Sequence, residues 1–285
     1  MMAPMDAEAF REESRARWGA VASAWARHRQ EFQRAAMAVS EWLVDAIDPQ
    51  PGQTVLELAA GPGDTGLLAA KRVAPDGRAV ITDGADAMVE VARARAAELG
   101  IENVELRPME AEWIDLPAAS VDGVLCRWGY MLLADPEAAL RETRRVLRPG
   151  GRVALAAWDA REHNPWFTVG QDVLVAHDVA PGPSPGVPDG FSFARPGRIE
   201  ELLGDAGFSE VLVDAVEFAF EPPDLDTWWS QLTETSGRAA EGIAALSPAQ
   251  HYELRDAFDA AYEPFVQEDG SLRLPARTLV AAASA

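Results

Sequence analysis

The stretch that decides the fold runs from Thr54 to Gly66 and reads TVLELAAGPGDTG. It begins as a short apolar run typical of a buried strand, and its glycine pattern Gly61-Pro-Gly63-Asp-Thr-Gly66 opens the amphipathic segment LLAAKRVA. Strand, glycine-rich turn and helix in this order make the setting that a G-x-G-x-x-G ligand-binding loop needs. The glycines let the backbone approach a ligand closely, and the helix start offers free N–H groups. By itself, the pattern is also that of dinucleotide-binding proteins or of a tight strand-to-helix turn.

Short apolar runs alternate with helical segments on the carboxyl side of this stretch. They lie at residues 79–82, 104–107, 121–126, 153–158 and 211–218, and a last one lies at 277–283. Such alternation is typical of a parallel sheet covered on both faces, and right-handed crossovers then give a doubly wound sheet. We therefore predict an α/β fold with a doubly wound, seven-stranded, mostly parallel sheet.

Helical segments flank the predicted sheet. Residues 6–48 hold few helix breakers and carry aromatic residues spaced by helical turns, and residues 222–265 predict further helices before the last strand. Residues 159–197 contain PGPSPGVPDG and are predicted to form a Pro/Gly-rich loop too long for a mere connector. We expect a single domain, 1–285, with a helical cap (1–48), a cofactor-binding core (50–217), a helical insertion or lid (218–275) and the last strand (276–285).

The composition narrows the class of protein. The 285 residues include 25 Lys+Arg against 46 Asp+Glu, a net charge of −21, which opposes nucleic-acid phosphates and anionic membrane surfaces. A single cysteine, Cys126, excludes an internal disulfide and a cysteine-only zinc site and fits a reducing cytosol. The N-terminal segment carries acids where a signal peptide is basic and then apolar. We expect a soluble cytoplasmic protein without a metal site; whether it forms a homodimer is left open.

Two acidic residues accompany the glycine loop. Glu57 lies inside the first predicted strand, and a carboxylate buried there needs a partner, either a ligand ammonium group or an arginine. Asp83 ends the second strand, 20 residues after Gly63, where a carboxylate accepts both hydroxyls of a ribose. A helix N-cap is the alternative for Asp83.

Four motifs occur in a characteristic order: ELAAGPGDTG (57–66), TDGADAM (82–88), VDGVLCRWG (121–129) and RVLRPGG (145–151). Together they resemble the class I S-adenosylmethionine-dependent methyltransferases. The likeness is to the branch that includes ubiquinone/menaquinone-biosynthesis enzymes and many small-molecule methyltransferases of secondary metabolism. It implies the Rossmann-like methyltransferase fold, S-adenosylmethionine as cofactor, and methyl transfer to an oxygen or carbon of a hydrophobic or aromatic small molecule, such as a phenol, quinone or polyketide-like natural product.

The resemblance also assigns residues to the cofactor. Glu57 and the loop 59–63 would hold its methionine part and Asp83 its ribose, while the segment MEAEWIDLP would meet the adenine edge. Arg127 and Trp128 would line the sulfonium and acceptor side. The residues expected at the cofactor are Glu57, Ala59, Gly61, Gly63, Asp83, Gly84, Met88, Glu110, Ala111 and Arg127.

Three positions depart from the family pattern. Ala59 replaces the first glycine, which is tolerable only with a negative φ. Glu110 replaces the usual aspartate of the adenine segment, and Gly84 replaces a bulky residue, so that adenine stacking falls to Met88 or Met109. Each departure is expected to weaken cofactor binding without abolishing it.

The acceptor side is expected to combine a base with aromatic walls. An oxygen nucleophile loses a proton, and His163 is our first candidate for the general base because it follows the fifth strand, where loops form the mouth of such sites. Tryptophans suit a flat or apolar acceptor, although any one of them also suits the packing of cap on core. The residues expected at the acceptor are Trp25, His28, Trp128, Tyr130, Trp158 and Trp166; Tyr130 has a core position as its alternative.

Other functions remain open on these residues. A nicotinamide-dependent oxidoreductase shares the glycine pattern, but its loop normally follows the strand without the preceding Glu57-Leu-Ala-Ala. A methyltransferase-like protein that uses its cofactor structurally, for example a cyclase, and a protein interaction module are further alternatives.

Overall fold

The computed structural model describes residues 6–184 and 186–285, in which a seven-stranded sheet has the order β3-β2-β1-β4-β5-β7-β6. β7 pairs antiparallel with β5 and β6, and the other pairings are parallel. The predicted doubly wound sheet is confirmed. The strands are β1 Thr54–Glu57, β2 Arg78–Asp83, β3 Val104–Pro108, β4 Val121–Arg127, β5 Leu147–Trp158, β6 Ser209–Phe220 and β7 Leu274–Ser284.

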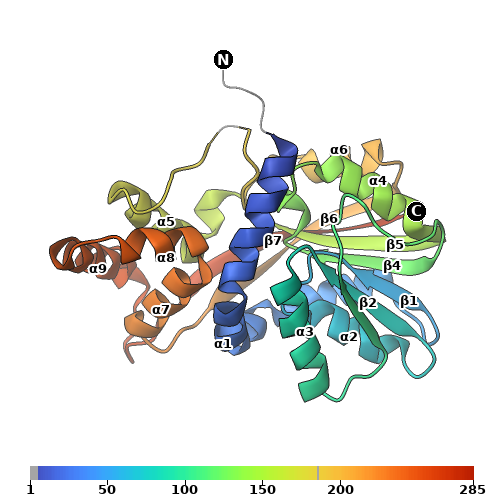
Figure 1. Ribbon diagram of the computed structural model, residues 1–285, viewed down its shortest axis with the longest axis horizontal. Helices are drawn as coiled ribbons and strands as arrows, with labels where there is room; N and C mark the ends of the chain where they lie inside the picture. Colours follow the sequence, from blue (N-terminus) through green and yellow to red (C-terminus); the bar gives the residue numbers. More distant parts are fainter. Residues whose placement is uncertain (1–5, 185) are drawn as a thin grey trace.

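Helices cover the sheet and extend to one side of it. In Figure 1, α1 crosses the molecule between the sheet and a group formed by α5, α7, α8 and α9. None of the helices in residues 6–184 and 186–285 is long and apolar enough to cross a membrane. The helices are α1 Ala7–Ile47, α2 Asp64–Val73, α3 Asp86–Glu98, α4 Pro136–Val146, α5 Pro165–Ala176, α6 Arg198–Asp205, α7 Leu225–Thr235, α8 Gly237–Ala244 and α9 Pro248–Tyr262, with short 3₁₀ turns η1 Tyr130–Leu132, η2 Arg161–His163 and η3 Glu263–Phe265.

The prediction of a loop over residues 159–197 is wrong in part. Residues 159–197, expected to be irregular, contain η2 and the 12-residue helix α5. Its sequence PWFTVGQDVLVA starts with a proline, which suits the first turn of a helix, and buries Leu174. The Pro/Gly-rich composition that suggested a loop belongs to the segment after α5.

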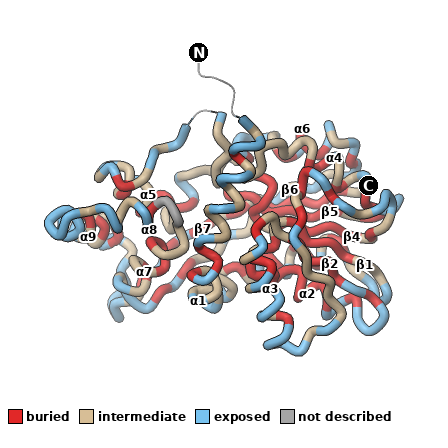
Figure 2. The backbone as a smooth tube through the Cα atoms, in the orientation of Figure 1, coloured by how far each residue is buried: buried red, intermediate tan, exposed pale blue. Residues whose placement is uncertain are grey.

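The second half of α1 is part of the hydrophobic core. Its apolar side chains Val39, Leu43 and Val44 are fully buried, and Figure 2 shows the buried strands on which the core is built. Ile47 packs on Gly123 of β4, where an added Cβ would lie 2.7 Å from the Ile47 Cδ1 atom. Close packing therefore anchors α1 on the sheet before the glycine loop begins.

Asn164 joins β5, α5 and β7. It is fully buried, and its Oδ1 accepts hydrogen bonds from the Arg277 backbone N–H (3.0 Å) and from Trp166 Nε1 (3.2 Å). Its Nδ2 donates to the carbonyl of Asp159 at 3.0 Å. This one amide positions the carboxyl end of β5 relative to its neighbours.

We expect Asn164→Ala to lower the free energy of unfolding by about 2–4 kcal/mol, because buried polar groups lose their partners. Urea unfolding followed by tryptophan fluorescence measures this. Gln267→Ala, which removes an exposed amide bonded to the Phe265 carbonyl, is the control and should change stability by less than about 0.5 kcal/mol. Equal effects of the two substitutions would contradict the role given to Asn164.

Candidate functional site

The glycine loop is held between the two strands that flank β1. Leu58 N–H donates to a β4 carbonyl and Ala60 N–H to a β2 carbonyl, both at 2.9 Å. Gly61 and Gly63 have φ of +53° and +81°. A Cβ at Gly61 would meet nothing within 4 Å, whereas one at Gly63 would lie 2.9 Å from Ala92 of α3. Gly61 therefore faces open space, and Gly63 allows α3 to pack closely.

Two non-glycine residues at this edge of the sheet have left-handed backbone. Ala59, just beyond β1, has φ +50°, and Trp128, directly after β4, has φ +59°. The expectation of a negative φ at Ala59 is therefore wrong. Its methyl group fits because residue 129 is glycine: a Cβ on Gly129 would come within 2.5 Å of it. Such conformations cost about 1–3 kcal/mol each and cluster at functional sites.

Glu57 is a buried carboxylate inside a strand. Its side chain accepts a hydrogen bond from Gly66 N–H at 2.8 Å, at the start of α2. Gly66 has no side chain to collide with this carboxylate. Burial raises the pKa of Glu57 to about 8, although the positive charge of Arg127 and the Gly66 hydrogen bond act in the opposite direction.

A second buried carboxylate lies beside Glu57. Arg127, at the end of β4, donates to Ser40 Oγ at 2.9 Å, and its Nη2 is 4.0 Å from Asp64 Oδ2. Asp64 Oδ1 is buried without a hydrogen-bond partner among the residues described, and burial raises the pKa of Asp64 against the pull of Arg127. Glu57 and Asp64 thus share one buried guanidinium, which suits a ligand with an ammonium group.

Asp83 closes the other side of the loop. Its Oδ2 accepts from Gly61 N–H (2.8 Å) and its Oδ1 from Ala85 N–H (2.9 Å). Burial raises the pKa of Asp83, and the two hydrogen bonds act against this. The N-cap of α3 is Ala85, so Asp83 is not the helix cap. Each carboxylate oxygen keeps a lone pair, which suits a pair of ribose hydroxyls.

The first half of α1 covers this edge. Arg15 pairs with Glu110 at 2.5 Å, and Arg11 pairs with the buried Glu112 at 2.6 Å. Glu110 approaches closely because residue 84 is glycine, where an added Cβ would lie 3.3 Å from its carboxylate. The predicted cofactor residues Met88 and Ala111 are buried nearby, Met88 in a cluster with Val21, Ala22 and Ala85 that Trp18 and Trp25 cover.

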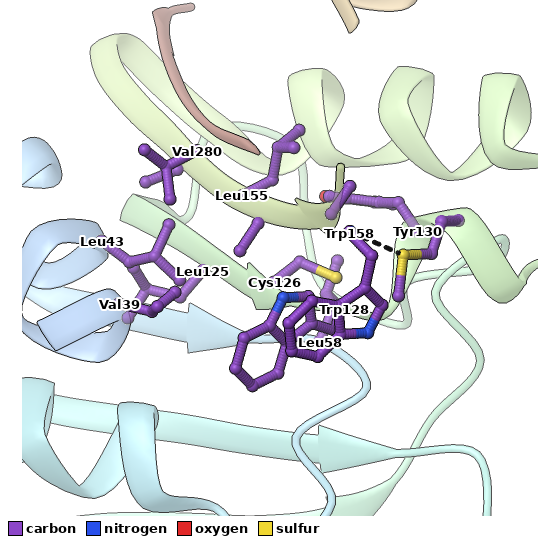
Figure 3. Packing of buried hydrophobic residues seen from close by; sticks show 14 of the residues in the cluster. Val39, Leu43, Leu58, Leu125, Cys126, Trp128, Tyr130, Leu155, Trp158 and Val280 are labelled. Atoms are coloured by element: carbon purple, nitrogen blue, oxygen red, sulfur yellow. Dashed lines mark hydrogen bonds between the residues drawn. The ribbon is translucent and has the colours of Figure 1, made fainter. Parts of the chain in front are cut away.

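An aromatic cluster adjoins the loop. Trp128 stacks on Trp158 with ring centroids 4.3 Å apart, as Figure 3 shows, and Trp166 lies 4.8 Å from Trp158. Phe32 of α1 packs against Trp128 at 5.7 Å and against Trp25 at 4.8 Å. Four of the tryptophans predicted at the acceptor are therefore connected through ring contacts. Their phenylalanine partners Phe32, Phe218 and Phe220 were not predicted.

The structure places two other predicted acceptor residues outside this cluster. The Tyr130 hydroxyl is buried 2.6 Å from Thr143 Oγ1, in the core position that was its alternative. His28 Nε2 lies 3.1 Å from Glu234 Oε2 of α7, a carboxylate that also accepts from Arg27. The hydrogen bond from Arg27 contributes most to lowering the pKa of Glu234 to about 2. Arg27 and His28 thus join the cap helix α1 to Glu234 in the helical insertion.

His163 belongs to a pair that the sequence did not reveal. Its Nδ1 lies 3.0 Å from Oδ2 of Asp159, a residue that is only 8% exposed. Arg277 of β7 also approaches Asp159 Oδ2, at 3.2 Å. The close spacing of Asp159 and His163 is the one signal from which the pair could have been predicted.

Comparison with known proteins identifies the family. Residues 55–151 match a family model described as a methyltransferase domain. The nocamycin O-methyltransferase of Saccharothrix syringae is 32% identical over 258 residues, covering 82% of this chain and 91% of that protein. This chain belongs to the S-adenosylmethionine-dependent methyltransferases. Its family cofactor is S-adenosylmethionine, and the buried carboxylates and Asp83 fit the ammonium and ribose of that molecule.

Other members of the methyltransferase family match shorter segments. The ubiquinone/menaquinone biosynthesis C-methyltransferase UbiE of Enterobacter sp. (strain 638) is 36% identical over 111 residues, 39% of this chain and 44% of that protein. The aklanonic acid methyltransferase DauC of Streptomyces sp. (strain C5) is 36% identical over 115 residues, 40% and 52%. The chain thus spans about half the length of these two relatives. The YcgJ protein from Bacillus subtilis shares the fold, with a TM-score of 0.56 and 19% identity over 86% of this chain and 97% of that one.

The buried Glu57 makes cofactor affinity depend on pH. With its pKa at about 8, the carboxyl must lose its proton to pair with the ligand ammonium, so we expect S-adenosylhomocysteine affinity to rise up to about tenfold per pH unit from pH 6 to 8. Isothermal titration measures the affinity and the proton released. In the free protein the same group makes folding less stable as pH rises from 4.5 toward 8, because only the unfolded chain has lost the proton.

Glu57→Gln is the control for this titration. It should bind S-adenosylhomocysteine more weakly at pH 8 and show a flat profile. A wild-type affinity that does not change between pH 6 and 8 would contradict the placement of the ammonium beside Glu57.

Proposed function

We propose that the protein transfers the methyl group of S-adenosylmethionine to an oxygen or carbon of a hydrophobic, aromatic small molecule. The observation that carries the proposal is the contact between the two halves of the site: the Arg127 guanidinium lies beside Asp64 and also 5.0 Å from the Trp128 ring centroid. The carboxylates of the cofactor loop and the aromatic cluster are therefore neighbours. The names of the nocamycin, UbiE and DauC relatives support small-molecule acceptors and both O- and C-methylation. A cytoplasmic location stays a prediction.

The residues of this chain do their work by binding and by excluding water. The cofactor supplies an electrophilic methyl group on a sulfonium. Glu57 and Asp64 hold its ammonium group and Asp83 its ribose. The stacked rings of Trp128 and Trp158, each 8% exposed, form an apolar wall that keeps water away, and a flat acceptor would pack against the exposed edge of this wall. Holding nucleophile and methyl group in line is the main catalytic contribution in such a displacement.

For an oxygen acceptor, His163 is the proposed general base. Because an ionised carboxylate can only accept, the 3.0 Å contact with Asp159 assigns the proton to Nδ1 and leaves the Nε2 lone pair free to take a proton, and Arg277 Nη1 lies 3.5 Å from the same Nδ1. Arg277 neutralises part of the Asp159 charge and is itself 3.8 Å from Glu217. Arg161 and Glu162 stand on the same 3₁₀ turn as His163. Asp159 acts here as a positioning residue, since it orients the imidazole.

Cofactor binding is tested with Asp83→Ala. We expect this substitution to weaken S-adenosylhomocysteine binding about 10- to 100-fold, since hydrogen bonds to a charged group are lost. The control is Asp86→Ala, which removes an exposed acid at the first residue of α3 and should leave binding unchanged. Equal affinities of the two variants would contradict the ribose role.

Methyl transfer itself is tested with labelled S-adenosylmethionine and a panel of phenols, quinols and polyketides. The proposal is supported if the wild type transfers the label to a panel member and the Asp83→Ala variant does not. Cofactor binding without transfer to any acceptor would favour the cyclase alternative instead.

The role of His163 is tested by its pH profile. With an oxygen acceptor, Asp159→Asn should lower kcat/KM about 10- to 100-fold and displace the acidic limb of the profile, and His163→Gln should remove that limb. Glu217→Gln, an exposed change next to Arg277, should leave the profile in place. A profile that is the same in all three variants would contradict the assignment.

A further inference from the structure

A cavity of about 270 Å³ lies where α1, the end of β6, α7 and the start of β7 meet. This volume is slightly below the range of about 300–1,000 Å³ that is typical of small-molecule sites. The end of β6 lies on the same edge of the sheet as the end of β5, because both strands pair antiparallel with β7. The lining residues that matter are Glu31, Arg34, Phe220, Glu221, Gln231 and Arg273.

The polar groups of this cavity are largely uncommitted. Gln231 is only 5% exposed, yet its side-chain amide makes no hydrogen bond to the groups that the structure describes, which are residues 6–184 and 186–285 without the side chains of residues 237 and 238. Arg34 and Glu31 are three residues apart on one helix, and neither forms an ion pair with another described residue. Arg273, in contrast, is neutralised by Glu221. A cation, an amide and a carboxylate thus remain available to a ligand.

The cavity shares one wall, the Phe220 ring, with the aromatic cluster. The Phe220 ring, which forms one wall, lies 5.2 Å from Phe32 and 4.6 Å from Trp166. Phe32 in turn contacts Trp128 at 5.7 Å. One layer of rings therefore separates the cavity from the tryptophan that adjoins Arg127 and the cofactor loop.

We propose that this cavity binds the acidic end of the acceptor, and that the acceptor is an aromatic hydroxy acid. Its carboxylate binds to the Arg34 guanidinium and the Gln231 amide, which are the uncommitted donors. Its ring packs on Phe220. The inference rests on the proposed function and names the acceptor class for it.

The experiment compares two probes with the same ring and hydroxyl: 1-hydroxy-2-naphthoate, which carries a carboxylate, and 1-naphthol, which does not. Both are titrated into the full-length protein, with and without saturating S-adenosylhomocysteine, and binding is followed by tryptophan fluorescence and calorimetry. We expect the wild type to bind the naphthoate about tenfold or more tightly than the naphthol.

Substitutions locate the binding site. Arg34→Ala should weaken naphthoate binding about tenfold and leave naphthol binding unchanged, because Arg34 is exposed and its loss spares the fold. Gln231→Leu should weaken naphthoate binding by a smaller factor. The control is Arg72→Ala, which removes an exposed arginine of α2 and should affect neither probe.

The outcomes separate this inference from the proposed function. Equal binding of the two probes by the wild type, or equal effects of Arg34→Ala and Arg72→Ala, would overturn the cavity assignment even if S-adenosylhomocysteine binds. Absence of S-adenosylhomocysteine binding would contradict the proposed function, whereas carboxylate selectivity that depends on Arg34 would still support the cavity as a binding site.

Discussion

The rest of the site depends on one buried carboxylate. Glu57 lies at the end of β1, where strands on both sides remove water, and the Gly66 N–H holds it at 2.8 Å. That bond requires the chain to turn back within a few residues, which the glycine loop makes possible, and it requires a residue without a side chain at position 66. The start of α2 is thereby fixed against β1, and Asp64 is brought beside Arg127. Burial makes this carboxyl costly to ionise and raises its pKa, and we propose that the ammonium group of the ligand is the partner that compensates its charge.

Strain and aromatic packing connect the cofactor loop to the acceptor side. Ala59 and Trp128 adopt left-handed backbone at the ends of neighbouring strands, and Gly129 gives the Ala59 methyl group its space. The turn at Trp128 lets its indole stack on Trp158 and donate to Thr278 of β7 at 2.9 Å. The strain is therefore balanced by a large apolar contact. The stacked rings also form the surface against which Phe32 of α1 packs.

Local sequence patterns predicted most of the sheet, and they also single out the residues that we propose for the cofactor site. The alternation of apolar runs and helices is a short-range signal, and Glu57 and Asp83 are recognisable by their distance from the glycines. The helix α5 was missed because the Pro/Gly-rich segment after it dominated the composition of residues 159–197. The sign of φ at Ala59 depends on residue 129, which is distant in sequence.

Long-range contacts set the limit of prediction on the acceptor side. The ring contact between Phe32 and Phe220 and the ion pair between Asp159 and Arg277 join segments that only the folded sheet brings together. Tyr130 looked available for an acceptor hydroxyl, but helix α4 presents Thr143 to it. The uncommitted groups of the cavity likewise come from α1 and α7, whose meeting no local pattern reveals.

The central claim is that the loop edge and the stacked tryptophans form one active site. A crystal structure of the protein with S-adenosylhomocysteine tests it most directly. The account predicts that the amino group of the ligand contacts Glu57, that its ribose hydroxyls bind Asp83, and that its sulfur faces Trp128. A ligand bound away from Asp83, or one whose sulfur points away from the aromatic cluster, would contradict it.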